Sequence, residues 1–487
     1  MKQFKTLVAL VLALMLTLSV ASVAFAADAD GSIEVKSTHK GQEYELYQLF
    51  DATTIEGRVD DGAGISYKLM SGKTDFKAGT LDGATWFKLD DGGNVVIKDD
   101  TAAAAITDDN ADFIAWAKAY GKKTGDTIEA SADDAEVKWT GLAEGYYFIS
   151  TTTGSLVTID SIKPNAEVQD KNPGTSIDKK ITGATEGSID DDGKNALAQV
   201  GTDVSYESRI PISRGAYNYK FTDVMTDGLT LKADTVKVYV VDSGATVAEG
   251  ASDVNSACGT VAASNKTGTD ADITVVFDDD WLKSNWEKDI VIKYTATINK
   301  DAIIADDANP NTAKIEYGNV DKPLTDEDEA KVYSAKVTVK KVDGDGAALE
   351  GAGFKLQNVD KKWYKITDGI VSWVDNKDDG TEIKPIKGAG TEAVASFTGL
   401  KDGKYTLVET TVPNGFNQAA DVDVTIKPAS TNNLTTELTV ESEVTNNKGA
   451  ELPSTGGIGT TIFYIAGAVL VLGAAAIVIA RRKAEQD

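Results

Sequence analysis

Apolar side chains recur at every second position along most of residues 27–448, and this alternation limits the fold more than any other feature. Clear examples are residues 235–240, 290–296 and 336–341. Successive side chains of a β-strand point to opposite faces, so a period of two indicates strands with one buried face. Short strands separated by Gly, Asp and Asn turns are typical of antiparallel sandwiches. The sequence therefore predicts a mainly β protein built from tandem immunoglobulin-like β-sandwiches.

One segment has a helical period instead. Asp109 can cap a helix in which Phe113, Trp116 and Tyr120 share a face, and Gly121 can end that helix. We therefore expect one short helix in the N-terminal domain.

The N-terminal end has the features of a secretory signal peptide. Lys2 and Lys5 give a basic start, residues 7–23 are apolar, and Ala24 and Ala26 form a small-residue cleavage site. A buried helix would explain the apolar run but not the charged start or the cleavage site. We expect residues 1–26 to be removed.

The C-terminal end combines three elements in a fixed order. Residues 452–456 read Leu-Pro-Ser-Thr-Gly, residues 457–480 are apolar, and residues 481–483 read Arg-Arg-Lys. The apolar run is long enough to span a membrane, and the basic tail favours the cytoplasmic side. An ordinary tail anchor needs no such pentapeptide, so the order of the three elements indicates a sorting signal in residues 449–487.

Composition shifts divide the remaining chain into three parts. Pro173 and Gly174 interrupt the periodicity, and the polar stretch 321–329 precedes a further strand-rich region. We therefore expect an N-terminal domain over residues 27–174, a second sandwich over 175–334 and a third over 335–448.

Charge and composition exclude several functions. The formal net charge is −27 at pH 7, so a nucleic-acid backbone would be repelled. Cys258 is the single cysteine of the sequence, which rules out a disulfide within the chain, and His39 is the single histidine. The acidic clusters do not complete an EF-hand. We assign no metal and no cofactor, and any covalent reinforcement must use other chemistry.

The C-terminal arrangement resembles the cell-wall sorting signal of Gram-positive surface proteins, which are sortase substrates. The resemblance implies cleavage between Thr455 and Gly456, transfer of Thr455 to an amine, and a location in the cell wall or a surface fimbrium.

Residues 335–448 closely resemble the collagen-adhesin B-type (Cna B) domain of such proteins. The motifs that carry the resemblance are residues 341–346, 349–354, 403–416 and 444–448. The resemblance implies a spontaneous isopeptide bond between Lys341 and Asn446, assisted by the acid Glu409. Strand parity independently points all three side chains into the core, because each follows apolar residues at alternate positions. Taken singly, such residues are usually exposed.

The preceding region resembles the fimbrial isopeptide-forming domain of Gram-positive shaft pilins, on residues 177–181, 217–229 and 309–319. The resemblance implies Lys179 as the amine and Asp223 as the acid. Asn311 is the preferred acceptor, because first and last strands are expected to run parallel and an early Lys should meet an early Asn. Asn319 is in phase with Asn311 and remains an alternative.

In pilus assembly the Thr455 acyl group passes to a Lys of the next subunit, usually within a Tyr-Pro-Lys-Asn motif. Here Lys171 and Asn172 match that motif, whereas Gln169 and Asp170 replace its first two residues. Lys171 is the preferred nucleophile because it adjoins a linker, and Lys163 is the alternative.

The resemblance thus predicts a structural shaft pilin, not an enzyme, that is polymerised by a class C type sortase. Expected partners are identical subunits, minor pilins, peptidoglycan and host surface ligands. Two alternatives stay open. One is a singly wall-anchored adhesin or minor pilin, which would not need Lys171. The other is a secreted enzyme, although no nucleophile, base and orienting group are arranged in the sequence.

Overall fold

The fold is that of a computed structural model of the chain. It describes residues 31–54, 65–106, 110–152, 156–161, 165–170, 174–266, 270–305, 307–318, 323–388, 390–430, 438–450 and 459–484. The signal peptide expected over residues 1–26 lies outside these ranges. The described strands fall into three consecutive groups, which we call the N-terminal block (31–170), the middle block (174–334) and the C-terminal block (335–450).

The N-terminal block contains two sheets. Their strand orders are β10-β1-β13 and β12-β11-β2-β3-β7-β6, and β8 and β9 also pair with β2. A separate pair joins β4 and β5. The elements are β1 (Gly31–Lys36), β2 (Glu43–Thr54), β3 (Ile65–Leu69), β4 (Lys77–Ala78), β5 (Leu81–Asp82), η1 (Gly83–Thr85), β6 (Phe87–Leu89), β7 (Val95–Ile97), α2 (Asp100–Ala105), α3 (Ala111–Tyr120), β8 (Lys122–Lys123), β9 (Ile128–Glu129), β10 (Val137–Leu142), β11 (Gly145–Thr151), β12 (Leu156–Ser161) and β13 (Asn165–Gln169).

Helix α3 is the predicted helix, with one correction. Its N-cap is Asn110 and not Asp109, because the Asn110 side chain accepts the backbone N–H groups of Asp112 and Phe113. Gly121 ends the helix as expected. The short helix α2, which was not predicted, gives this block a second helix.

The middle block is a two-sheet sandwich. One sheet has the order β14-β17-β23-β19, with β20 beside β23, and the other has the order β15-β16-β25-β24-β18-β22-β21. The elements are β14 (Asp178–Ala184), β15 (Gly187–Ile189), β16 (Asn195–Ala198), β17 (Asp203–Pro211), β18 (Lys220–Met225), β19 (Leu229–Leu231), η2 (Ala233–Thr235), β20 (Lys237–Asp242), β21 (Gly259–Ala263), β22 (Ile273–Phe277), α4 (Asp279–Ser284), β23 (Lys288–Ile298), β24 (Asn309–Tyr317) and β25 (Leu324–Tyr333).

Strand β25 begins within the polar stretch 321–329 that precedes the C-terminal block. From Leu324 onward this stretch is a strand that pairs antiparallel with β24 over nine positions. Its acidic residues have a structural role, since Asp326 accepts the N–H of Ile177 at 2.8 Å and Asp328 accepts the N–H of Lys179 at 2.7 Å. Carboxylates of β25 therefore hold the start of β14 beside it.

The C-terminal block is a second two-sheet sandwich. Its strand orders are β30-β26-β33 and β29-β28-β27-β31-β32, and β26 and β33 run parallel. The elements are β26 (Ala335–Asp343), β27 (Gly353–Asn358), β28 (Trp363–Thr367), β29 (Ile370–Val374), η3 (Lys377–Asp379), β30 (Ala393–Leu400), β31 (Gly403–Thr411), β32 (Val422–Ile426) and β33 (Thr439–Asn446). The mainly β fold that the alternation predicted is confirmed.

The junction between the middle and C-terminal blocks is closely packed. One continuous apolar core runs through both blocks, whereas the N-terminal block has two separate cores. At the junction the Trp373 indole donates to the Gln199 side chain at 2.6 Å, and the Ser334 hydroxyl donates to the Ala198 carbonyl at 2.9 Å. At the other junction the Tyr217 hydroxyl donates to the Thr152 carbonyl at 2.7 Å.

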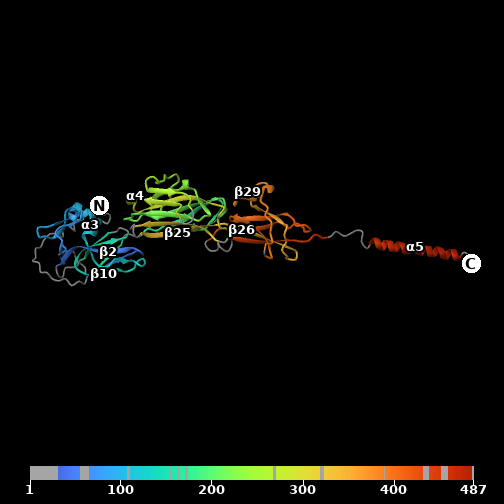
Figure 1. The fold of residues 1–487 in the computed structure, drawn as a ribbon, viewed down its shortest axis with the longest axis horizontal. Helices are drawn as coiled ribbons and strands as arrows, with labels where there is room; N and C mark the ends of the chain where they lie inside the picture. Colours follow the sequence, from blue (N-terminus) through green and yellow to red (C-terminus); the bar gives the residue numbers. More distant parts are fainter. Residues whose placement is uncertain are drawn as a thin grey trace.

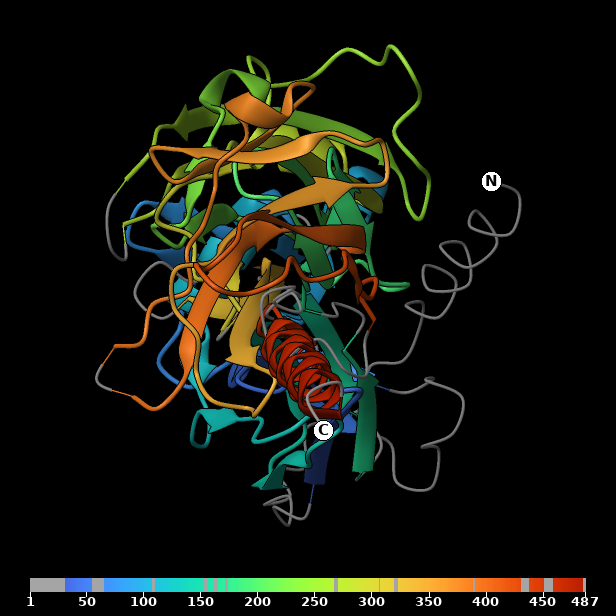
Figure 2. The same cartoon turned by 90° about the vertical axis from the view of Figure 1, so that its right-hand side faces the viewer.

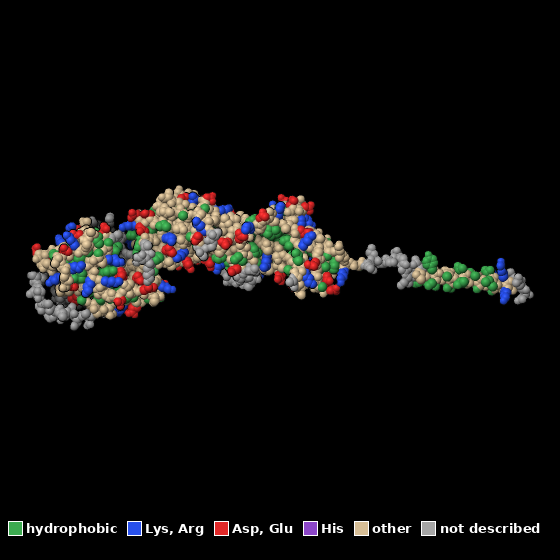
Figure 3. Space-filling view, in the orientation of Figure 1, with side chains coloured by type: hydrophobic (Ala, Val, Ile, Leu, Met, Phe, Trp, Pro, Cys, Tyr) green, Lys and Arg blue, Asp and Glu red, His purple; other side chains and the backbone are tan. Residues whose placement is uncertain are grey.

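The three blocks follow one another along the long axis, and helix α5 (Gly459–Ala484) extends beyond them (Figure 1). Viewed along that axis, α5 is seen nearly end-on in front of the β blocks (Figure 2). Within α5, residues Thr461–Lys483 have a mean hydropathy of 2.7 and are long and apolar enough to cross a membrane. Hydrophobic side chains cover this helix, whereas charged side chains are spread over the blocks (Figure 3).

Trp116 tests the packing of α3 against the N-terminal sheet. Its side chain is fully buried, its indole donates to the Phe76 carbonyl at 2.7 Å, and its ring stacks on Tyr120. Trp116→Ala should lower the free energy of unfolding of this block by about 3–5 kcal/mol, because it leaves a cavity and an unpaired carbonyl. Hydrogen exchange localised to residues 31–170 measures the loss.

Leu89→Ala is the control, since Leu89 is 41% exposed and its truncation should cost little. Equal effects of the two substitutions would contradict this account of the N-terminal core.

Candidate functional sites in two sandwich cores

Buried lysines mark both sandwich cores. Among the described residues, Lys179 and Lys341 are completely inaccessible to solvent, and Lys355 is 9% exposed. Lys355 donates to the Lys377 carbonyl at 2.6 Å. Lysines are almost never fully buried without a partner, so the surroundings of the first two need explanation.

The middle-block site joins side chains from both sheets. Lys179 lies on β14 and Tyr294 on β23 of one sheet, while Asp223 on β18 and Asn311 on β24 come from the facing sheet. Lys179, Asp223 and Asn311 are fully buried. The alternating pattern of each strand directs these side chains inward together with its apolar residues.

A compact hydrogen-bond network connects these groups. Lys179 Nζ lies 2.5 Å from Asp223 Oδ2, and the same oxygen accepts the Tyr294 hydroxyl at 2.5 Å. The Tyr294 oxygen in turn accepts from Lys179 Nζ and, at 3.3 Å, from Asn311 Nδ2. Asp223 Oδ1 and Asn311 Oδ1 are buried, and neither has a hydrogen-bond partner among the residues that the structure describes.

Burial shifts both charged groups toward neutrality. It lowers the pKa of Lys179, although the Asp223 charge opposes the change, and it raises the pKa of Asp223 against the influence of Lys179. Burial and the charge of Asp223 also raise the pKa of Tyr294 well above its ordinary value. The site therefore favours a neutral amine next to a protonated acid, with Tyr294 keeping its hydroxyl proton.

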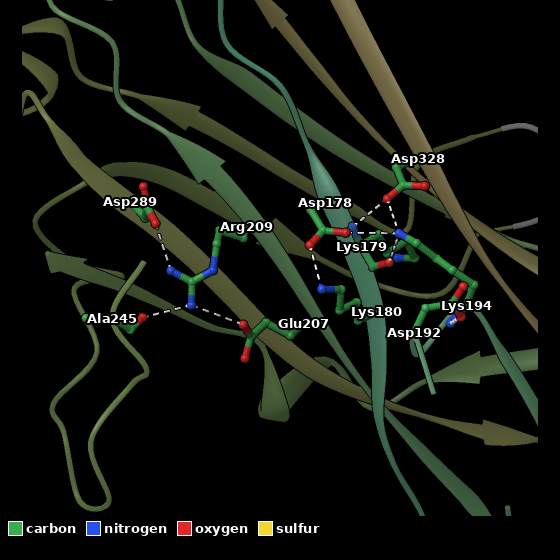
Figure 4. A network of polar contacts seen from close by, with 10 residues as sticks. All are labelled: Asp178, Lys179, Lys180, Asp192, Lys194, Glu207, Arg209, Ala245, Asp289 and Asp328. Atoms are coloured by element: carbon green, nitrogen blue, oxygen red, sulfur yellow. Dashed lines mark hydrogen bonds and ion pairs between the residues drawn. The ribbon is translucent and has the colours of Figure 1, made fainter. Parts of the chain in front are cut away.

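The backbone of Lys179 is fixed by ionic groups at the edge of the sandwich (Figure 4). Asp328 Oδ2 accepts the Lys179 N–H, and Lys194 Nζ donates to the Lys179 carbonyl at 2.6 Å. Lys194 also pairs with Asp328 and with Asp178. Side chains at the edge of the sandwich thus bind both the N–H and the carbonyl of Lys179. These contacts fix the backbone position from which the buried side chain extends.

The C-terminal site has a different arrangement of the same groups. Lys341 on β26 and Asn446 on β33 belong to neighbouring parallel strands of one sheet, and Glu409 on β31 comes from the facing sheet. All three are at most 1% exposed. Asn446 Nδ2 donates to Glu409 Oε1 at 2.8 Å and to Oε2 at 3.1 Å, and Ala419 N–H donates to Oε2 at 2.8 Å.

The Lys341 amine lies between the two strands that carry the lysine and the amide. Its Nζ donates to the carbonyls of Val342 at 2.7 Å and Val444 at 2.9 Å. Burial lowers the pKa of Lys341, while the charges of Glu409 and Asp343 oppose this shift. Asn446 Oδ1 is buried and accepts no hydrogen bond from the described part of the chain.

The structure thus brings Lys341, Glu409 and Asn446 together, and it brings Lys179, Asp223 and Asn311 together. The strand argument for Asn311 was wrong in one respect. Strand β24 is not the last strand of its block, since β25 follows it and lies beside β14, and Asn311 reaches Lys179 from the facing sheet. Sequence reasoning missed Tyr294, Asp328 and Lys194. The alternation along β23 indicates that Tyr294 points inward, but no sequence signal shows what its hydroxyl contacts.

Several predicted residues lie outside the described ranges: Asn319, Lys163, Lys171, Thr455 and Gly456. Asp170, which precedes Lys171, is buried and accepts the Tyr44 hydroxyl at 2.7 Å. Within the described part of the N-terminal block, no lysine is buried.

Comparison with protein families gives three matches. Residues 335–444 match a prealbumin-like fold domain (SpaA), residues 200–323 match a Cna-B-like domain of Gram-positive pilin backbone subunit 2, and residues 444–485 match the LPXTG cell wall anchor motif. The chain is therefore similar to Gram-positive backbone pilins in these regions, and the cell wall anchor motif together with this similarity indicates a surface-anchored pilus of a Gram-positive bacterium.

Two individual proteins are also similar to this chain. The trypsin-resistant surface T6 protein of Streptococcus pyogenes serotype M6 is 26% identical over 383 residues, which are 63% of this chain and 68% of the relative. The solved T6 backbone pilin of serotype M6 Streptococcus pyogenes, described as a modular three-domain structure, has a TM-score of 0.50 at 17% identity. That match covers 83% of this chain and 81% of the solved chain, and it concerns the fold alone.

The pH dependence of stability tests whether burial lowers the pKa of the Lys341 amine. In an Asn446→Ala variant the proposed crosslink cannot form, so Lys341 stays a free amine. Because its pKa is lower in the folded chain than in the unfolded chain, the unfolded chain binds one more proton at pH values between these two pKa values. The stability of the C-terminal block should therefore rise with pH from that lowered pKa to the ordinary lysine value of about 10.4, and stay flat below this window. Urea unfolding across this pH range measures the slope.

The matched control is the double variant Lys341→Met and Asn446→Ala, which keeps the other titrating groups. The difference in slope between the two variants isolates Lys341. Identical slopes would show that the buried amine has an ordinary pKa.

Proposed function

We propose that this chain is the shaft subunit of a sortase-assembled pilus, strengthened by one Lys–Asn isopeptide bond in the middle block and one in the C-terminal block. The observation that carries the proposal is that each of the two cores holds a lysine amine, a carboxylic acid and an asparagine amide away from water. We further propose that the three blocks are domains over residues 27–174, 175–334 and 335–448. The chain would then be a substrate of sortase and not itself an enzyme.

In the C-terminal block the reaction joins neighbouring strands. The neutral Lys341 amine attacks Cγ of Asn446, a new C–N bond forms, the bond from Cγ to Nδ2 breaks, and Nδ2 leaves as ammonia. Glu409 contacts Nδ2 directly, so it is placed to carry one proton from the attacking Lys341 nitrogen to the leaving nitrogen. Fixed proximity of the reacting groups replaces an external catalyst.

In the middle block the same reaction would join the two sheets through Lys179 and Asn311. The proton exchange between Lys179 and Asp223 supplies the neutral amine and the acid, and both pKa shifts favour that exchange. Because Asn311 lies in this network, we retain it as the acceptor in preference to Asn319.

Polymerisation would use the two regions that flank the blocks. A class C type sortase cleaves between Thr455 and Gly456 and transfers Thr455 to Lys171 of the next subunit, with Lys163 as the alternative nucleophile. Minor pilins, peptidoglycan and host surface ligands are the further proposed partners. The anchored Asp170 would hold the chain next to Lys171.

The mass of the purified full-length chain tests the internal bonds. It should be lower than the mass of its formula by two ammonia molecules, because each bond releases one. Asn446→Ala and Asn311→Ala should each lose one ammonia, and the double variant none. Asn358→Ala, which changes an asparagine outside both sites, is the control and should still lose two. A natural chain with its formula mass would refute self-crosslinking.

High-mass ladders on a denaturing gel of cell-wall extracts test polymerisation. Lys171→Ala should abolish the ladders, since no nucleophile would resolve the acyl enzyme, while Lys163→Ala should keep them. The opposite pattern would assign the joint to Lys163. A single wall-linked band from the natural chain would instead favour a singly anchored adhesin or minor pilin.

A further inference from the structure

The two sites differ in how the acid meets the amide. In the C-terminal block Glu409 accepts directly from the amide nitrogen of Asn446 through both of its oxygens. In the middle block no hydrogen bond among the described residues joins Asp223 to Asn311, and none of these residues donates to Asp223 Oδ1. If the two sites perform one reaction, the middle block needs another route from the acid to the leaving nitrogen.

The Tyr294 hydroxyl occupies the position between them. It donates to Asp223 Oδ2 at 2.5 Å and accepts from Asn311 Nδ2 at 3.3 Å, and it also accepts from Lys179 Nζ. One oxygen therefore contacts the acid, the leaving nitrogen and the attacking amine. In the C-terminal block the Glu409 carboxylate itself contacts the leaving nitrogen of Asn446.

The position of this hydroxyl is fixed by packing. Tyr294 is 2% exposed on β23, and its ring stacks on Tyr206 of the neighbouring strand β17, with 5.4 Å between ring centres. The Tyr206 hydroxyl faces the Asn311 side chain without a hydrogen bond of acceptable geometry to any described residue, and Lys179 Nζ lies 5.0 Å from the centre of the Tyr206 ring. Both tyrosines therefore border the site, but of the two only Tyr294 donates a hydrogen bond to Asp223 in the described part of the chain.

We infer that Tyr294 is a catalytic residue of the middle-block crosslinking site, relaying a proton from Asp223 to the amide nitrogen of Asn311. This inference rests on the proposed function. Lys179 first gives a proton to Asp223, and its neutral amine attacks Cγ of Asn311. Asp223 then passes its proton to the Tyr294 oxygen while Tyr294 gives its own proton to Nδ2, and Nδ2 departs.

The proton balance closes within the site. The attacking nitrogen still carries one proton too many after the new bond forms, and this proton returns to Asp223 or enters the leaving group. The products are one secondary amide and one ammonia molecule, and Tyr294 ends with a proton as it began. The relay also explains why an aspartate suffices here, since its side chain is one methylene shorter than that of Glu409.

The test measures crosslinking rates at both sites in one molecule. Full-length chain made by cell-free synthesis is quenched in acid at intervals, and digestion followed by mass spectrometry counts linked Lys179–Asn311 and Lys341–Asn446 peptides. Tyr294→Phe should slow the middle-block reaction by about 100-fold or more, which is the usual contribution of a general acid. The C-terminal reaction should keep its rate and serve as an internal reference.

Two further variants separate a relay from a packing role. Tyr206→Phe removes a hydroxyl that faces Asn311 but does not contact Asp223, so it should slow the middle-block reaction far less than Tyr294→Phe does and leave the C-terminal rate unchanged. The double variant Asp223→Glu and Tyr294→Phe copies the direct contact of the C-terminal site and should recover most of the lost rate. A residue that acts through packing would not be rescued by lengthening the acid.

The outcomes distinguish this inference from the proposed function. A natural chain without either linked peptide would overturn both. A natural chain with both links, in which Tyr294→Phe reacts as fast as the natural chain, would overturn the relay alone. Equal slowing by Tyr206→Phe, or failure of the longer acid to restore any rate, would also overturn the relay, because the effect would then reflect general packing.

Discussion

Placing a lysine amine inside a β-sandwich is costly unless an acid or a change of protonation offsets the lost hydration. Two cores of this chain contain such an amine, and the rest of each site follows from that constraint. The acid must enter from the facing sheet, and the amide must lie where the amine can reach it. Through the proposed reaction, a chain with a single cysteine would join its strands covalently without disulfides.

The two sites solve the same problem with different topologies. In the C-terminal block the amine and the amide belong to neighbouring parallel strands, so the proposed bond lies within one sheet. In the middle block they belong to opposite sheets, so the bond would connect the two layers. The acid changes accordingly from a glutamate that touches the amide to an aspartate that contacts a tyrosine.

Strand parity was enough to predict that Lys341, Glu409 and Asn446 point inward, because each continues an apolar face. It could not predict Tyr294, since an inward tyrosine is ordinary core packing until the facing strand is known. Strand β25 was missed because its acidic residues hide the alternation. These acidic side chains have a structural role, because Asp326 and Asp328 accept the backbone N–H groups of Ile177 and Lys179. Contacts between segments so distant in the sequence leave no local pattern.

Strand β25 also has a mechanical consequence. If Lys179 is joined to Asn311, tension along the fibre passes through this bond and does not stretch the chain between the two residues. A bond between Lys341 and Asn446 would protect residues 342–445 in the same way. The segment from Asn311 to Ala335 lies outside both loops, held by its pairing with β24 and by the carboxylates that bind β14. Fully extended, this segment would span roughly 80 Å. A fibre of such subunits would therefore lengthen before any covalent bond is strained.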